Sequence, residues 1–87
     1  MWHIVYKKSV KKDLKRISKD ILYIIQRAIE EKLVSDPIRF GIPLRRNLKG
    51  LMKLRVGDYR IIYSIDRKTI IVYVIKIGHR RDVYSNI

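Results

Sequence analysis

A tight β-hairpin is predicted by the stretch Lys53-Leu54-Arg55-Val56-Gly57-Asp58-Tyr59-Arg60. Its two-residue loop is Gly57-Asp58, of the Gly-X type, and the runs on either side alternate apolar and basic residues. This loop sets Arg55 opposite Arg60 across the strands, and the period of two places Lys53 on the same face. Like charges directly opposite each other destabilise a sheet. Three cations on one small patch therefore indicate a surface that binds an anionic ligand.

The elements around this hairpin follow from hydrophobic spacing and from turn residues. The pattern predicts, in order, a strand near 2–6, a helix over 9–19, a second helix over 21–33 with Ser18 or Asp20 as its N-cap, a loop with a short extended piece over 37–50, and strands over 52–56, 59–65 and 69–77. Asp36-Pro37 is expected to end the second helix, because a residue before proline avoids the helical region. The predicted fold class is α+β: a small two-layer domain with an N-terminal strand, a helical hairpin on one sheet face and a three-stranded antiparallel meander (β-α-α-β-β-β).

The chain is strongly basic. Twenty-one Lys and Arg residues against eight Asp and Glu give a formal net charge of +13, and the sequence pI is about 10.4. This balance favours nucleic acid, an anionic membrane or an acidic protein as the partner. The ordinary hydrophobic content of 47% separates the chain from disordered basic tails.

Length and residue usage limit the number of domains, the kinds of metal or disulfide site and the cellular location that the chain can have. Eighty-seven residues allow one domain, residues 1–87. Cysteine is absent from the sequence, which excludes disulfides and cysteine zinc sites, and two histidines without clustered carboxylates do not make a metal site. The longest apolar run, Ile70 to Ile75, is far too short for a membrane span, and lysines stand where a signal peptide has its apolar core. We therefore expect a cytoplasmic protein with no metal, no cofactor and no membrane association.

Two motifs carry a family resemblance. The first is the hairpin stretch continued to Tyr63, and the second is Ile77-Gly78-His79-Arg80-Arg81-Asp82-Val83-Tyr84. With the order and length of the elements, these motifs closely resemble toxins of the RelE/ParE superfamily from bacterial and archaeal toxin–antitoxin systems, over essentially the whole chain. The resemblance implies a RelE-like toxin domain that is monomeric when free and is held inactive in a hetero-oligomer with a cognate acidic antitoxin.

The superfamily has two activities. RelE-like members cut messenger RNA in the ribosomal A site, where they meet ribosomal RNA, whereas ParE-like members inhibit DNA gyrase without cutting RNA. The C-terminal motif is more similar to the RelE branch, which carries a basic pair and a tyrosine there. The resemblance thus implies a ribosome-dependent mRNA endonuclease. The alternatives are a ParE-like gyrase inhibitor and a non-catalytic basic nucleic-acid-binding module.

Carried over by position, the resemblance implies catalytic roles for four residues. Lys53 would help to activate the nucleophile, and Arg60 would steady the reacting phosphate. Arg80 would protonate the leaving group, and Tyr84 would stack on a nucleotide. Fewer residues separate Tyr84 from the preceding glycine than in the best known member, so either Arg80 or Arg81 could occupy the position of the acid.

Leu51 is the main departure from the family pattern. The family has a further catalytic lysine at this position. Lys49 could replace that lysine from the loop, or the activity could be weaker. The missing lysine is the best sequence argument for the two non-enzymatic alternatives.

The chemistry can also be argued from the residues. Metal-free RNA cleavage requires that the 2′-hydroxyl loses a proton, that the pentacoordinate phosphate is stabilised and that the leaving 5′-oxygen is protonated or neutralised. Arg60 suits the phosphate because its planar fork donates two parallel hydrogen bonds. Lys53 is expected to act as the base because nearby cations favour its neutral form, and His79 is an alternative acid or base because imidazole titrates near neutrality. The cations expected to bind RNA are Arg55, Lys49 and Arg81.

Each candidate also has a purely structural interpretation. These are a solvated strand face for Lys53 and Arg55, an ion pair with Asp58 or Asp82 for Arg60, and packing against the sheet for Tyr84. The lysines of the first helix are most simply its solvated face, although on a ribosome they would also meet RNA phosphates.

Overall fold

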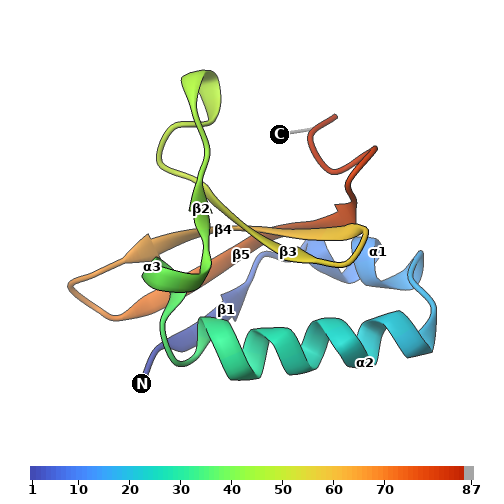
Figure 1. Ribbon diagram of the computed structural model, residues 1–87, viewed down its shortest axis with the longest axis horizontal. Helices are drawn as coiled ribbons and strands as arrows, with labels where there is room; N and C mark the ends of the chain where they lie inside the picture. Colours follow the sequence, from blue (N-terminus) through green and yellow to red (C-terminus); the bar gives the residue numbers. More distant parts are fainter. Residues whose placement is uncertain (86–87) are drawn as a thin grey trace.

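The computed structural model describes residues 1–85 as two layers, a five-stranded sheet with helices on one face (Figure 1). The elements in chain order are β1 (His3–Tyr6), α1 (Val10–Lys15), α2 (Lys19–Ala28), the π-helical turn η1 (Ile29–Leu33), α3 (Pro37–Phe40), β2 (Ile42–Pro43), the 3₁₀ turn η2 (Arg46–Leu48), β3 (Met52–Val56), β4 (Tyr59–Asp66) and β5 (Ile71–His79). The predicted α+β class with an N-terminal strand, two helices and a meander is confirmed.

The strands lie in the order β1-β5-β4-β3-β2. β1 is parallel to β5, and all other pairs are antiparallel. The hairpin between β3 and β4 has the predicted register, with Arg55 opposite Arg60. Gly57 has a φ of +59°, which a glycine adopts without the cost that a side chain would add, and Asp58 after it keeps a negative φ. Positive φ at the first loop position alone is the pattern of a II′ hairpin turn.

The core lies between the helices and one sheet face. The continuous helical stretch formed by α2 and η1 contributes Ile25, Ile29 and Leu33, spaced four residues apart, and all three are buried. A spacing of four exceeds the 3.6-residue period of an α-helix, so the stripe would drift around the axis. The π-helical turn corrects this drift because it holds more residues, and its bond runs from the Val34 N–H to the Ile29 carbonyl at 3.0 Å.

The first predicted helix is shorter than expected. α1 ends at Lys15 instead of Lys19, and the chain turns through Ile17, which is buried, before α2 begins. Ser18 takes the N-cap position with an extended backbone and without a capping side-chain bond. The break is favoured because it lets both helices direct apolar residues to the same core.

The predicted loop over 37–50 contains two short helical elements and a short strand. Asp36 and Pro37 end the preceding helix as expected, but they also start α3, with Pro37 at its first position and the Asp36 carboxylate accepting from the Arg39 N–H at 3.1 Å. This pair is both a stop signal and a start signal. The predicted extended piece is β2, which adds Ile42 opposite Lys53 at the edge of the sheet.

Buried Tyr63 fixes this segment to the core. Its hydroxyl donates to the Pro37 carbonyl at 2.6 Å, and burial, followed by the charge of Asp36, raises the pKa of the phenol. The ring leaves no space at Gly41, where a Cβ would lie 1.7 Å from the Tyr63 hydroxyl oxygen. Strand β2 is thereby held against β3.

No helix within residues 1–85 has the length and apolar character that crossing a membrane requires.

Candidate active site

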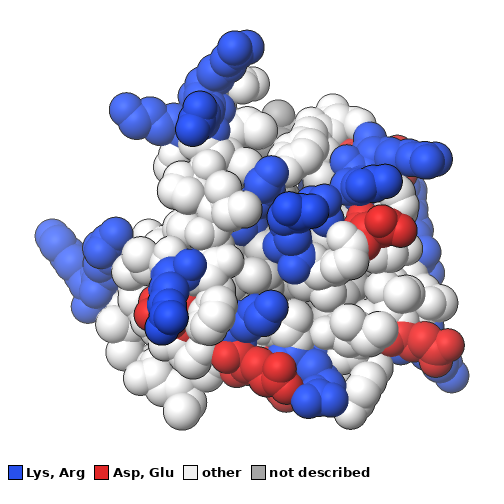
Figure 2. All heavy atoms as spheres, viewed as in Figure 1, with Lys and Arg blue, Asp and Glu red and all other residues white. Residues whose placement is uncertain are grey.

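The sheet face away from α1 and α2 carries a row of cations. The register places Lys53 opposite Ile62, which in turn lies opposite Lys76, and it places Arg55 opposite Arg60. These four basic residues share one face because paired residues point the same way and strand residues alternate. We call Lys53, Arg55, Arg60 and Lys76 the outer patch. Figure 2 shows further basic side chains on the loop that rises above the sheet and beside the C-terminal segment.

Arg60 is the most enclosed member of the outer patch. Its side chain is buried, with 7% of the residue exposed, and its Nη1 donates to the carbonyls of Gly57 and Tyr59, each at 2.8 Å. The ion pairs formed within residues 1–85 are Arg27–Glu31 and Arg80–Asp58, so Arg60 does not pair with Asp58 or Asp82. Two backbone carbonyls orient the guanidinium, and its other N–H groups remain for a ligand.

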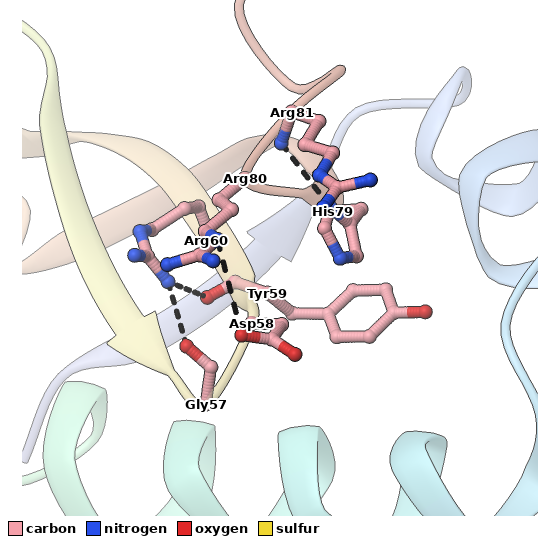
Figure 3. A network of polar contacts seen from close by, with 7 residues as sticks. All are labelled: Gly57, Asp58, Tyr59, Arg60, His79, Arg80 and Arg81. Atoms are coloured by element: carbon pink, nitrogen blue, oxygen red, sulfur yellow. Dashed lines mark hydrogen bonds and ion pairs between the residues drawn. The ribbon is translucent and has the colours of Figure 1, made fainter.

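Arg80 is anchored on the same hairpin loop. Its backbone N–H donates to the Asp58 carbonyl at 2.8 Å, and its Nε lies 3.9 Å from Asp58 Oδ1 (Figure 3). Both side chains of this ion pair are more than half exposed, so the pair adds little stability. The loop at 57–59 thus holds both candidate arginines, Arg60 by its guanidinium and Arg80 mainly by its backbone.

His79 lies on the other side of the sheet from Arg60. It pairs with Tyr59, the neighbour of Arg60 on β4, and the two rings meet edge to face with centroids 5.6 Å apart. His79 Nδ1 accepts from the Arg81 backbone N–H at 3.2 Å (Figure 3). The structure therefore brings His79 and Arg81 together at the end of β5, apart from the outer patch.

The C-terminal segment folds back over the outer face. Val83 is fully buried and lies over Gly78, where a Cβ would be 3.6 Å from the Val83 Cβ. Gly78 is the β5 partner of Arg60, so this contact fixes the segment beside the buried arginine. Tyr84 follows directly and keeps 38% of its surface exposed.

Lys49 and Leu51 lie on the loop before β3. Lys49 is exposed and precedes Gly50, whose φ of +97° turns the chain towards the strand. Leu51 is half-buried, and its N–H donates to the Leu48 carbonyl at 3.1 Å. The loop also exposes Arg45 and Arg46, two cations that were absent from the sequence-based set. The sequence feature that could have identified them is their position in the basic stretch directly before the hairpin.

Lys76 is a further residue that was not predicted from the sequence. The pairing of β4 with β5 passes from Ile62–Lys76 to Tyr63–Val74, which leaves Ile75 as an extra residue on β5. This bulge reverses the side-chain alternation after Val74 and turns Lys76 to the outer face. No local sequence signal marks the bulge. Within the described part of the chain, no group of three or more histidine or carboxylate side chains could hold a metal ion.

The fold is that of chains in solved toxin–antitoxin complexes. The structure is similar to a chain of the toxin–antitoxin complex RelBE2 from Mycobacterium tuberculosis, with a TM-score of 0.85 and 30% sequence identity, covering 91% of this chain and 98% of the other. A chain of the RelB–RelE antitoxin–toxin complex from Methanococcus jannaschii gives a TM-score of 0.70 at 24% identity, covering 93% of this chain and 95% of that one.

Sequence comparison defines the family. The model of the ParE toxin of type II toxin–antitoxin system, parDE, matches residues 4–84. Toxin RelG of Mycobacterium tuberculosis (strain ATCC 25618 / H37Rv) is 34% identical over 76 residues, 87% of each chain. Toxin RelE of the same strain is 34% identical over 83 residues, 95% of this chain and 86% of the relative. The chain belongs to the RelE/ParE family and is a toxin of a type II toxin–antitoxin system.

Proposed function

We propose that this toxin is a ribosome-dependent mRNA endonuclease that cleaves by 2′-hydroxyl attack without a metal. The observation that carries the proposal is Arg60, a buried cation on the same face as Lys53, oriented by two carbonyls and without a carboxylate partner in residues 1–85. A buried charge without a counter-ion costs stability. An anionic ligand such as a phosphate would offset this loss of stability and would meet hydrogen-bond donors that are already oriented.

The geometry favours a division of roles. Lys53, half-buried on β3, removes the proton of the 2′-hydroxyl, and the 2′-oxygen attacks the phosphorus that Arg60 holds. The bond from phosphorus to the 5′-oxygen breaks, and Arg80, or Arg81 beside it, supplies the proton to that oxygen. The products are a 2′,3′-cyclic phosphate and a 5′-hydroxyl. His79 is less suited to be the base because it lies on the other side of the sheet.

The remaining cations would bind the rest of the substrate. Tyr84 would stack on an unpaired base, and Lys49 and Arg55 would contact RNA phosphates. The toxin would act on cytoplasmic ribosomes, and its first helix would meet ribosomal RNA. An acidic antitoxin would neutralise the toxin, in keeping with the similar chains from Methanococcus jannaschii and Pyrococcus horikoshii, which were solved as complexes of RelE with RelB.

A second candidate is inhibition of DNA gyrase without RNA cleavage. It is favoured by the match to the ParE toxin model and by Leu51 at the position of a family lysine. The half-buried Leu51 side chain cannot act as an acid or a base.

Primer-extension mapping of cellular mRNA after brief induction separates the two candidates. The endonuclease leaves discrete breaks inside translated frames within minutes, whereas the inhibitor leaves messages intact and arrests gyrase on DNA. The matched control is the Arg60→Ala toxin expressed at the same level. Intact messages together with arrested gyrase would replace the first proposal with the second.

A further inference from the structure

A cavity lies at the edge of β5 that β1 leaves unpaired. Strand β1 pairs with β5 only as far as Tyr6 opposite Val74, so no strand within residues 1–85 lies on that side of the later part of β5. Helix α1 covers it instead, and Asp13 Oδ2 accepts from the Ile77 backbone N–H at 3.1 Å. Beside this contact lies a cavity of about 630 Å³, between α1, the end of β5 and the turns that follow. Its volume is typical of pockets that hold small ligands.

The lining of this cavity, which we call the rim pocket, combines three kinds of chemical group. Its cations are Arg16, Lys76 and Arg81, its carboxylates are Asp13 and Asp82, and its aromatic side chains are Tyr59 and His79. The two rings meet edge to face. Since Asp13 uses Oδ2 to bind β5, its second oxygen remains an acceptor. A ligand that matches this lining has a negative group, hydrogen-bond donors and a flat ring.

We propose that the rim pocket binds one nucleotide of the RNA strand, next to the scissile phosphate; this inference rests on the proposed function. The Arg16 and Arg81 guanidinium groups suit its phosphate, and the Tyr59 ring suits its base. The carboxylates accept from a base amino group or from a ribose hydroxyl. A single RNA nucleotide has a negative phosphate, hydrogen-bond donors and a flat base, and so matches all three kinds of group in the lining.

An acidic antitoxin segment fits this lining less well. It would bring carboxylates to a pocket that already holds those of Asp13 and Asp82, and like charges repel. The outer patch has no such carboxylate among its members and suits an acidic chain better.

The rim pocket shares residues with the candidate catalytic segment at the end of β5. His79 and Arg81 line it, and Arg80 between them in sequence is anchored on the hairpin loop that also holds Arg60. Lys76 belongs both to the outer patch and to the pocket. An RNA strand held at Arg60 on the outer face would pass over the end of β5 at Gly78 and Lys76, both of which line the pocket, and place its neighbouring nucleotide there.

Titration of the free toxin with adenosine and guanosine 5′-monophosphate, followed by NMR, tests the proposal without the ribosome. The amide signals of Ile77 and Gly78 and the Tyr59 ring signals should shift. Arg16→Gln should weaken this binding roughly tenfold, because a charge-assisted contact to phosphate is lost. Lys15→Gln is the matched control, because Lys15 is the preceding residue, is exposed and does not line the pocket. Its affinity should stay within about twofold of the wild type.

The outcomes distinguish this proposal from the proposed function. Absent shifts, equal losses in the two variants, inorganic phosphate that binds as tightly as the nucleotides, or a glutamate-rich peptide that binds in their place would each overturn it. Ribosome-programmed cleavage is the separate readout, in which Arg16→Gln should raise KM with little change in kcat. Nucleotide binding without any cleavage would support the pocket and contradict the endonuclease, whereas cleavage without nucleotide binding would do the reverse.

Discussion

At the scale of single residues, the environment of Arg60 is the structural feature that most directly supports the proposed chemistry. Its guanidinium is buried, is held by the Gly57 and Tyr59 carbonyls and faces no carboxylate within residues 1–85. Carbonyls can orient a guanidinium, but they do not neutralise its charge as a carboxylate would. The side chain is therefore preorganised for a ligand with a full negative charge.

Replacing Arg60 by Ala should lower the cleavage rate on programmed ribosomes about a hundredfold or more, corresponding to about 3 kcal/mol of transition-state stabilisation. The reason is the loss of an oriented donor to the phosphate. Lys12→Ala is the control, because Lys12 is exposed on α1 and contributes at most one phosphate contact, so its effect should be on ribosome affinity and the salt dependence. Circular dichroism checks that both variants fold. Equal rate losses would mean that general attraction, not catalysis, explains the cations.

The residues whose placement depends on local rules are predictable from the sequence. The Gly57-Asp58 loop determines the Arg55–Arg60 register, and both follow from turn chemistry. Lys76 could not be found this way, because alternation from Val74 would turn it into the core, and only the bulge opposite β4 reverses it. The pocket around Arg16 also escaped prediction, since it depends on where β1 stops beside β5.

At the scale of elements, the meander was predictable and the loop before it was not. The predicted strand over 52–56 has the observed bounds, and those over 59–65 and 69–77 differ from β4 and β5 by one or two residues. Strong alternation and clear turn residues explain this agreement. The segment over 37–50 instead takes its form from Tyr63, distant in sequence, whose hydroxyl bonds the Pro37 carbonyl.

Tyr63→Phe should therefore destabilise the toxin by about 1–3 kcal/mol, because the buried Pro37 carbonyl loses its donor. Urea unfolding measures the change. Tyr73→Phe is the matched control, because Tyr73 is exposed on β5 and its hydroxyl has no hydrogen bond to another residue in the described chain; it should change stability by less than about 0.5 kcal/mol. A loss of equal size in Tyr73→Phe would contradict the role of the Pro37 contact.

The same tyrosine gives a pH dependence. Burial and the charge of Asp36 raise the pKa of Tyr63 in the folded toxin above its unfolded value of about 10. The contribution of the neutral Tyr63 phenol to the free energy of unfolding is complete below a pH of about 10. It is lost as the pH rises towards the folded pKa, because the phenol of the unfolded chain ionises first. Tyr63→Phe should flatten the alkaline decline in the free energy of unfolding, whereas an unchanged decline would assign it to other groups.

At the scale of the whole molecule, the net charge of +13 attracts the free toxin to polyanions in general. We expect the neighbouring reading frame to encode a small acidic antitoxin that is partly disordered and that covers the outer patch or displaces the segment with Tyr84. Co-expression should abolish toxicity, and co-purification should yield a hetero-oligomer. A bound neighbour that leaves toxicity unchanged would remove the main support for neutralisation by the antitoxin.

Cleavage by 2′-hydroxyl attack leaves characteristic end groups on the RNA, and neither a gyrase inhibitor nor a non-catalytic binding module would produce them. If Lys53 removes the 2′-proton beside a phosphate held by Arg60, the 5′ fragment should end in a 2′,3′-cyclic phosphate. A message with a 2′-deoxy nucleotide at the scissile position should still bind, because its phosphates and bases are unchanged, yet it should not be cut. The rate on the normal message should be independent of any divalent ion beyond the magnesium that the ribosome itself requires. Mass spectrometry of the fragments reads the end groups, and cutting of the deoxy message would exclude 2′-hydroxyl attack.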